Sequence, residues 1–181
     1  GRAAFIGGGR DNVVENNIFV ECEPSVHVDA RGLSWGKFYF DPSLPHSVRT
    51  LFDAMDAMNF RQPPYSEKYP ELLKLYDDEP AVPKYNKILR NVSYGGKWVG
   101  FLDGVDFALV EIRGNLIAGP DLGTLSGKDG EKKVTPGDLS PDNKVMDGDP
   151  GFVDLANKNF QLREDSPAYA LGFQRIPIEK I

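Results

Sequence analysis

Residues 12–20 read NVVENNIFV, and the pattern of this stretch recurs twice further along the chain. The related stretches are NKILRNVSY at residues 86–94 and VEIRGNLIA at residues 110–118. In all three, a β-branched residue stands three positions before an asparagine, and an aliphatic residue follows that asparagine directly. The anchoring asparagines are Asn17, Asn91 and Asn115. Such a repeat predicts short strands that stack in parallel and bury a continuous apolar column.

The spacing of these asparagines predicts the course of the chain. Asn91 and Asn115 are 24 positions apart, which suits one coil of a parallel β-solenoid. Asn17 and Asn91 are 74 positions apart, which leaves one coil and an insertion of about 50 residues. Asparagine tolerates left-handed backbone angles and its amide can bond to neighbours above and below, so stacked asparagines stabilise a recurring turn. The repeat thus predicts a mainly β fold, a single solenoid domain over residues 1–181.

Two parts of the chain depart from the repeat. Residues 37–85 are expected to form a two-helix insertion, because SLP at residues 43–45 suits a helix start and apolar residues follow at helical spacing. Those apolar residues are Val48, Leu51, Phe52 and Met55. A second short helix is expected over residues 69–76. Residues 120–142 are polar, contain glycine and proline and lack an apolar period, so we expect a flexible surface loop with at most a short hairpin.

The composition limits the classes of protein to which the chain can belong. With 181 residues, of which 40% are hydrophobic, the chain is long enough to bury the core of one domain. A formal net charge of −6, without a clustered Lys/Arg tract, argues against a nucleic-acid partner. No stretch approaches about 18 consecutive apolar residues, so no membrane span is expected. Cys22 is the only cysteine, which excludes an internal disulfide.

The start of the sequence suggests a piece of a longer protein. Its first residue is Gly1 rather than methionine, and residues 1–12 read like the middle of a strand followed by a glycine-rich turn. We therefore expect the C-terminal part of a longer chain, whose first strands would expose unpaired backbone groups. That edge predicts self-association of the fragment through residues 3–6 and 13–19.

Two stretches carry a family resemblance. GRDNVVENNIFVECEPSVHVDARG, residues 9–32, resembles a coil of the right-handed parallel β-helix proteins, the pectate-lyase-like superfamily of bacterial carbohydrate-active proteins. DPGFVDLANKNFQLREDSPAYALGF, residues 149–173, is similar to the closing segment and end cap common in that group. The resemblance implies a right-handed parallel β-helix with a C-terminal cap, found in secreted or periplasmic proteins that act on polysaccharides.

The function that the resemblance implies is polysaccharide degradation. We expect the C-terminal region of a secreted polysaccharide-degrading enzyme, with glycoside hydrolysis favoured. Two alternatives stay open, a polysaccharide lyase and a non-catalytic β-helix domain that binds glycan or completes a larger chain. Because fold alone is weak support for an activity, the residues of the site must decide between them.

The densest polar signal in the chain is VHVDARG at residues 26–32. Alternation along a strand places His27, Asp29 and Arg31 on one side and the apolar residues on the other. In a polysaccharide groove Asp29 would act as general acid, base or nucleophile, Arg31 would bind a carboxylate or abstract a proton, and His27 would contact substrate. The alternative is that Asp29 and Arg31 form a structural ion pair at the exit into the insertion.

Two further carboxylates follow about one coil later. Asp103 approaches Asp29 if the coils stack, and Asp106 would add to the substrate contacts. Carboxylates roughly 5–9 Å apart satisfy the geometry of glycoside hydrolysis. The catalytic candidates are therefore Asp29, Asp103 and Arg31. The alternative makes Asp103 part of a turn with Gly104 and Asp106 a solvated loop residue.

Trp35 heads a cluster of aromatic residues directly after the Asp29 strand, with residues 38–40 (FYF) behind it. Exposed aromatic rings stack on sugar faces, so Trp35 is a candidate for substrate binding. These rings equally suit a hydrophobic base on which the insertion packs.

No metal site and no cofactor are expected. Aspartates near the C-terminus supply oxygen atoms suited to calcium, but they lack the EF-hand spacing and their turn sequences explain them. They are Asp142, Asp147, Asp149 and Asp154. The expected partner is a polysaccharide or oligosaccharide.

Overall fold

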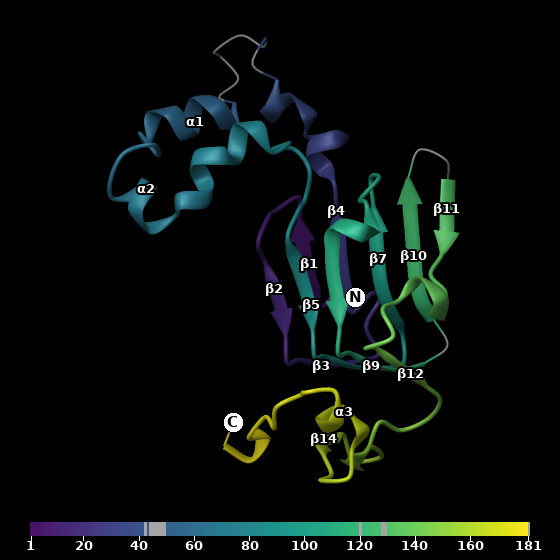
Figure 1. Cartoon of the computed structure of the whole chain (residues 1–181). Helices are drawn as coiled ribbons and strands as arrows, with labels where there is room; N and C mark the ends of the chain where they lie inside the picture. Colours follow the sequence, from purple (N-terminus) through teal and green to yellow (C-terminus); the bar gives the residue numbers. More distant parts are fainter. Residues whose placement is uncertain (42, 44–49, 120, 128–129, 181) are drawn as a thin grey trace.

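Most strands of the computed structural model form three sheets, which are parallel except at one edge of sheet A (Figure 1). The structure describes residues 1–41, 43, 50–119, 121–127 and 130–180. Sheet A contains β1 (Ala4–Gly7), β4 (Val26–Asp29), β7 (Lys97–Leu102) and β10 (Asp121–Gly127), with β11 (Gly130–Lys133) antiparallel at its edge. Sheet B contains β2 (Val13–Glu15), β5 (Asn86–Leu89) and β8 (Val110–Arg113). Sheet C contains β3 (Ile18–Val20), β6 (Val92–Tyr94), β9 (Leu116–Ala118) and β12 (Lys144–Met146).

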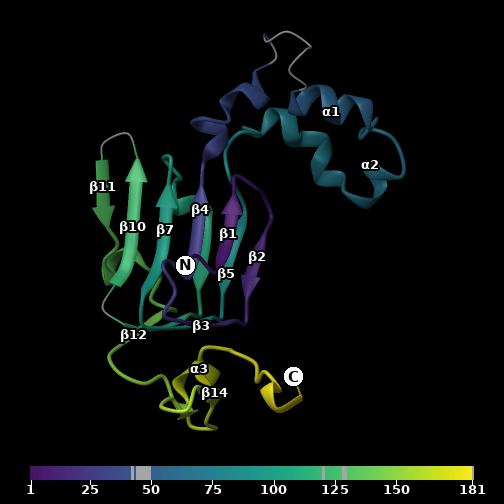
Figure 2. The same cartoon turned by 180° about the vertical axis from the view of Figure 1, so that it is seen from behind.

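The chain contributes strands to the three sheets in turn. β1, β2 and β3 lie at one end of sheets A, B and C, and each later passage adds a strand beside the previous one. Sheet C runs across the lower ends of sheets A and B in both views (Figures 1 and 2). The three repeated stretches pair in the register that the sequence alignment predicts, with Val14 beside Ile88 and Ile88 beside Ile112.

The predicted asparagine stack is confirmed by its hydrogen bonds. The backbone N–H and Nδ2 of Asn17 both donate to Oδ1 of Asn91, at 3.0 and 2.9 Å. Asn91 donates in the same way to Asn115, at 2.9 and 3.0 Å. Asn115 donates to Asn143, at 3.1 and 2.8 Å. Asn143 is a fourth member that the repeat did not predict.

A single core fills the space between the three sheets. Inward-facing residues of each sheet are buried there, among them Val28, Phe101, Ile88, Ile112 and Phe19. The opposite face of sheet C packs against the C-terminal segment, which comprises β13 (Phe152–Asp154), β14 (Asn159–Leu162) and α3 (Pro167–Ala170). This segment lies below sheet C in Figure 1 and covers it with a second apolar cluster.

The predicted fold class is wrong. We expected a mainly β chain, a right-handed parallel β-helix, whereas the structure has mixed α/β content with several parallel sheets, 23% helical and 32% strand. The reason is that most strands have only three or four residues, while the insertion and many connections are helical. The insertion contains η1 (Arg31–Leu33), η2 (Lys37–Phe40), α1 (Leu51–Ala57), α2 (Tyr65–Lys68) and η3 (Pro70–Asp77). Shorter turns of helix are η4 (Phe107–Leu109), η5 (Pro136–Asp138) and η6 (Ile178–Lys180).

Helix α1 begins at Leu51, whereas the sequence proposed a start at residues 43–45. Thr50 caps it, because its hydroxyl accepts from the backbone N–H of Asp53 while the Asp53 carboxylate accepts from Thr50. The proposed start at residues 43–45 and Val48 fall largely outside the described residues. The second expected helix, residues 69–76, is the 3₁₀ helix η3.

For residues 120–142 we expected a flexible surface loop with at most a short hairpin, and the structure has a hairpin there whose first strand extends sheet A. The described part of this range contains β10, which pairs with β7 and extends sheet A, and β11, which returns antiparallel beside it. Leu122 is buried in the core although no apolar period surrounds it. A polar strand of this kind is recognisable only once its neighbour, β7, is in place.

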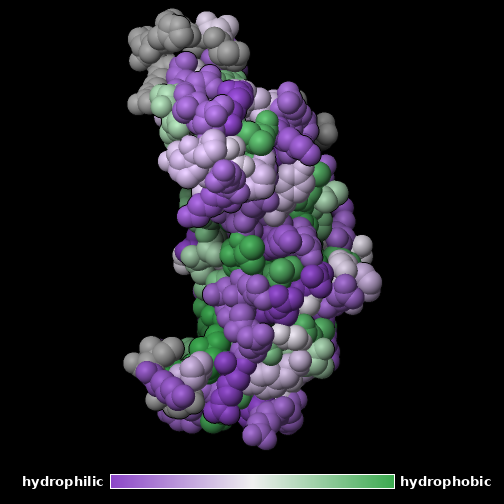
Figure 3. All heavy atoms as spheres, turned by 60° about the vertical axis from the view of Figure 1, so that its left-hand side comes forward, coloured by the Kyte–Doolittle hydropathy of each residue, from purple (hydrophilic) through white to green (hydrophobic). Residues whose placement is uncertain are grey.

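Figure 3 shows the side of the molecule that carries β2 and the helical insertion, and hydrophilic side chains cover most of it, with hydrophobic patches between them. In the part of the chain that the structure describes, no helix is long and apolar enough to cross a membrane.

Candidate functional site

Strand β4 positions the first two candidate residues. Val26 and Val28 point into the core, so His27 and Asp29 project from the outer face of sheet A, as alternation predicts. Beside His27 lies Phe5 of β1, whose ring centroid is 4.6 Å from that of the imidazole. The sequence led us to expect a solvent-facing groove, yet only 3% of His27 and 6% of Asp29 is exposed. Neighbouring side chains therefore cover the polar row of β4.

Arg31 is the residue that covers Asp29. It leaves the end of β4, turns back and donates from Nε to Oδ1 and from Nη2 to Oδ2 of Asp29, both at 2.8 Å. The guanidinium lies on the backbone of β1, where a Cβ on Gly7 would be only 2.5 Å from Arg31 Cζ. The next residue, Gly8, adopts a positive φ of 73°, and a Cβ there would be 2.9 Å from Arg31 Cγ. Because Gly7 and Gly8 have no side chains, the Arg31 side chain can lie against the backbone there, and the same glycines form a turn.

Two exposed aromatic rings flank the fixed guanidinium. Arg31 Cζ is 5.0 Å from the ring centroid of Phe5 and 5.3 Å from that of Trp35, distances at which a cation attracts an aromatic face. Phe5 is 51% exposed and Trp35 is 62% exposed, so each presents aromatic surface to solvent. We call Phe5, Arg31 and Trp35 the Arg31 platform.

The charges of the cluster are fixed by its contacts. Burial alone would raise the pKa of Asp29, but the hydrogen bonds from Arg31 outweigh it and hold that pKa below its usual range. The hydrogen bond to Asp29 raises the pKa of Arg31. Burial lowers the pKa of His27, and the charge of Arg2 lowers it further, while the contact with Asp29, 3.5 Å away, opposes this in part. At neutral pH the cluster thus holds a carboxylate, a guanidinium and a neutral imidazole.

These protonation states limit the chemistry of the cluster. Asp29 cannot donate a proton near neutral pH, and both its oxygens already accept from Arg31. Arg31 cannot abstract a proton, because its pKa is raised rather than lowered. The geometry matches the structural ion pair that we gave as the alternative for these two residues, with the guanidinium presented between two rings.

Asp103 and Asp106 occupy different surroundings. Asp103 directly follows β7, has a positive φ of 61° and is exposed, and its charge contributes to the raised pKa of Arg31. Asp106 caps η4, with its Oδ1 accepting from the backbone N–H of Ala108 at 2.9 Å. The structure therefore places Asp103 within electrostatic reach of the platform, whereas Asp106 has a local structural role.

A cavity of about 370 Å³ opens beside the platform. Arg31, Trp35 and Tyr39 line it on one side and Leu51 and Ala54 of α1 on the other. Trp35 is thus exposed at the platform, while the neighbouring rings help to line a space under the insertion. The cavity could receive one residue of a ligand that extends over Trp35.

Sequence reasoning missed a second polar cluster, around Arg10. Its Nη1 donates to the carbonyls of Asp78, Glu79 and Val82, at 3.0, 3.2 and 3.2 Å, and its Nη2 forms an ion pair with the Asp78 carboxylate. Lys84 Nζ and the Tyr85 hydroxyl donate to the same carboxylate, at 2.8 and 2.9 Å. No repeated sequence pattern connects Arg10 with Asp78, which lies 68 positions further along the chain.

The C-terminal aspartates are engaged in turns. Asp149 Oδ1 accepts from the backbone N–H groups of Gly151 and Phe152, and Asp154 accepts from Asn157. Within the described ranges, no group of three or more His, Cys, Asp or Glu side chains is arranged to hold a metal ion.

Comparisons with known proteins add no further assignment. No protein-family model matches the sequence, and neither the curated proteins nor the solved structures that were compared with the chain gave a match.

Proposed function

We propose that this chain binds an acidic polysaccharide on the outer face of sheet A, as part of a secreted or periplasmic polysaccharide-degrading protein. The observation that carries the proposal is the Arg31 platform, a guanidinium locked by Asp29 and flanked by two exposed rings. An exposed indole backed by a cation is a rigid, flat surface on which the C–H face of a sugar can stack.

Arg31 supports the preference for acidic sugars. Its Nε and Nη2 are occupied by Asp29, and within the described chain no hydrogen bond involves Nη1. The Arg31 side chain is 30% exposed, and we propose that the N–H groups of Nη1 bind a sugar carboxylate, for which the guanidinium geometry is suited. Arg2, whose Cζ lies 5.6 Å from the ring centroid of Phe5, adds a second positive charge to this surface. A neutral sugar would gain the stacking but not this charge-assisted bond.

The same contacts favour binding over cleavage within this chain. Glycoside hydrolysis needs a protonated acid and a free carboxylate, whereas Asp29 is ionised and bonded to Arg31 through both oxygens. A lyase needs a group that accepts a proton, and a guanidinium of raised pKa does not supply it. We therefore place the chain in the non-catalytic, glycan-binding alternative.

The proposal is tested by measuring affinity for a galacturonate oligomer with wild-type protein, Trp35→Ala and Tyr69→Ala. Tyr69 is a matched control, since it is 41% exposed and contacts Lys68 in the insertion, away from the platform. We expect Trp35→Ala to weaken binding at least about tenfold and Tyr69→Ala to leave it unchanged. An equal loss in both variants, or no binding by the wild type, would sink the proposal. Reducing-end release by the wild-type chain alone would show that cleavage occurs here after all.

A further inference from the structure

The arrangement of the Arg31 platform occurs a second time in the molecule. Arg10 is locked by Asp78, as Arg31 is locked by Asp29, and its Cζ lies 5.2 Å from the ring centroid of Tyr85. Tyr85 is 51% exposed, so its ring also presents surface to solvent. The hydroxyl of Tyr85 donates to Asp78 at 2.9 Å, which fixes the orientation of the ring.

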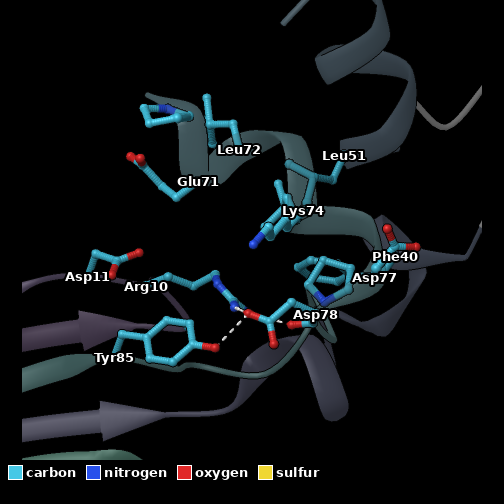
Figure 4. A pocket seen from close by; sticks show the side chains of 15 residues that line it. Arg10, Asp11, Phe40, Leu51, Glu71, Leu72, Lys74, Asp77, Asp78 and Tyr85 are labelled. Atoms are coloured by element: carbon cyan, nitrogen blue, oxygen red, sulfur yellow. Dashed lines mark hydrogen bonds and ion pairs between the residues drawn. The ribbon is translucent and has the colours of Figure 1, made fainter. Parts of the chain in front are cut away.

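This second arrangement borders a cavity of about 1280 Å³. The cavity lies between η3 of the insertion and the turn that follows β1, and Figure 4 shows its lining side chains. Leu51, Leu72 and Phe40 supply an apolar side. The space is large enough for several sugar residues.

We infer that this cavity is a second carbohydrate site, one that takes neutral sugars on the exposed surface of Tyr85. The inference rests on the proposed function, because it assigns a second part of the same glycan ligand to the same protein.

The polar groups of the cavity suit hydroxyls. Glu71, Lys74 and Asp77 stand three positions apart on the 3₁₀ helix η3, and side chains at that spacing lie above one another. Figure 4 shows the Lys74 amine pointing from η3 into the space above Arg10, with Asp11 lining the floor. Carboxylates that accept and an ammonium that donates, in alternation, match the hydroxyls of a sugar, each of which does both.

The charge of the cavity opposes an acidic sugar. Four carboxylates line it, from Asp11, Glu71, Asp77 and Asp78, against two cations, Arg10 and Lys74. Arg10 also differs from Arg31, since its Nη1 and Nη2 are both engaged, by the three carbonyls and by Asp78. It therefore backs the aromatic ring without offering an unused Nη group to a ligand carboxylate.

The test compares neutral and acidic oligosaccharides on one set of variants. Calorimetry would use xylose, mannose and glucose hexamers as neutral probes and a galacturonate hexamer as the acidic probe. Tyr85→Ala should weaken binding of a neutral hexamer at least about tenfold and leave the galacturonate affinity unchanged. Trp35→Ala should show the reverse.

Two further variants separate binding from folding. Tyr85→Phe keeps the ring and loses only the bond to Asp78, so it should retain neutral-sugar affinity within about threefold. Glu71→Gln, at an exposed position, should weaken that affinity without changing the unfolding midpoint. If no neutral hexamer binds while galacturonate binding persists, the second site is overturned and the proposed function stands. If Trp35→Ala abolishes binding of both classes, the cavity is not a separate site and the inference is likewise overturned.

Discussion

Asn91 Nδ2 donates to Asn115 Oδ1 at 3.0 Å, and both side chains are completely buried. The two central members, Asn91 and Asn115, each accept through the amide oxygen from the asparagine of one neighbouring layer and donate through the amide nitrogen to the asparagine of the other. Asn91 Oδ1 accepts two bonds from Asn17, and its Nδ2 also donates to the carbonyl of Val14. A central member of the stack therefore satisfies buried groups on both sides.

The stack predicts a graded loss of stability. Asn91→Ala removes the bonds that its side chain makes and leaves the backbone N–H of Asn17 without an acceptor, so we expect a loss of about 2–4 kcal/mol in the free energy of unfolding. Asn17→Ala, at the partly exposed end of the stack, should cost only about 1 kcal/mol, because the backbone N–H of residue 17 still donates to Asn91. Urea unfolding measures both. Equal losses of stability in the two variants would show that the buried bonds of Asn91 contribute no more than the bonds at the end of the stack.

His27 predicts a pH-dependent stability. Its folded pKa lies below the ordinary 6.5, so the unfolded state takes up a proton first as the pH falls. The free energy of unfolding should thus decrease as the pH is lowered from about 6.5 toward the folded pKa, and the stabilisation is complete above about 6.5. His27→Gln should flatten this part of the profile in urea titrations. The same slope in both proteins would contradict the assignment to His27.

Asp29 adds a separate loss at more acidic pH. Its folded pKa is also lowered, so its contribution is present above the ordinary value of 3.8 and disappears as the pH falls through the folded pKa. His27→Gln should keep this second, more acidic decrease, which makes it an internal control for the first.

We expect the substitution Trp98→Phe to lower the free energy of unfolding only slightly. The residue is 1% exposed, and its Nε1 has no hydrogen-bond partner among the described residues. Trp98→Phe loses volume but also removes an unsatisfied donor, so we expect it to cost less than about 1.5 kcal/mol, against about 3–5 kcal/mol for Trp98→Ala. Both values come from chemical unfolding. A cost for Trp98→Phe near that of the alanine variant would mean that the indole nitrogen is bonded.

We expect the lack of a side chain at Gly7 to determine the position of Arg31 in the platform. A methyl group there would overlap the Arg31 guanidinium, so Gly7→Ala should displace Arg31 and weaken galacturonate binding about as much as Arg31→Gln. Gly137→Ala is the control, because its added Cβ would meet only the Thr135 hydroxyl, at 3.8 Å. Calorimetry of the two variants checks this. Wild-type affinity in Gly7→Ala would show that galacturonate binding does not depend on the position of Arg31 against Gly7.

The stacked strands could be predicted because a short sequence pattern recurs in each of them and aligns their register. Asn17, Asn91 and Asn115 carry it, and the strands around them pair as aligned. The helical content was underestimated because connections such as η4 are too short to show a period. Strand β10 was missed because its polar sequence becomes a strand only through pairing with β7.

Strand alternation predicted that His27, Asp29 and Arg31 lie close together, but not that His27 and Asp29 are buried. Alternation brought His27, Asp29 and Arg31 together correctly, yet it could not show that Arg31 folds back over Asp29. That contact depends on Gly7, from a different strand. The cluster of Arg10 with Asp78 depends on how the insertion returns to the sheets, which no local pattern encodes.

The most direct test of the proposed function is a calorimetric comparison of two ligands that differ only in charge. Wild-type protein and Arg31→Gln would be titrated with a galacturonate hexamer and with the same hexamer after reduction of its carboxyl groups. We predict that the wild type binds the acidic hexamer at least about tenfold more tightly and that Arg31→Gln loses this preference while still binding both weakly through Trp35. Equal affinity of the wild type for both hexamers, or a preference that survives in Arg31→Gln, would contradict the account.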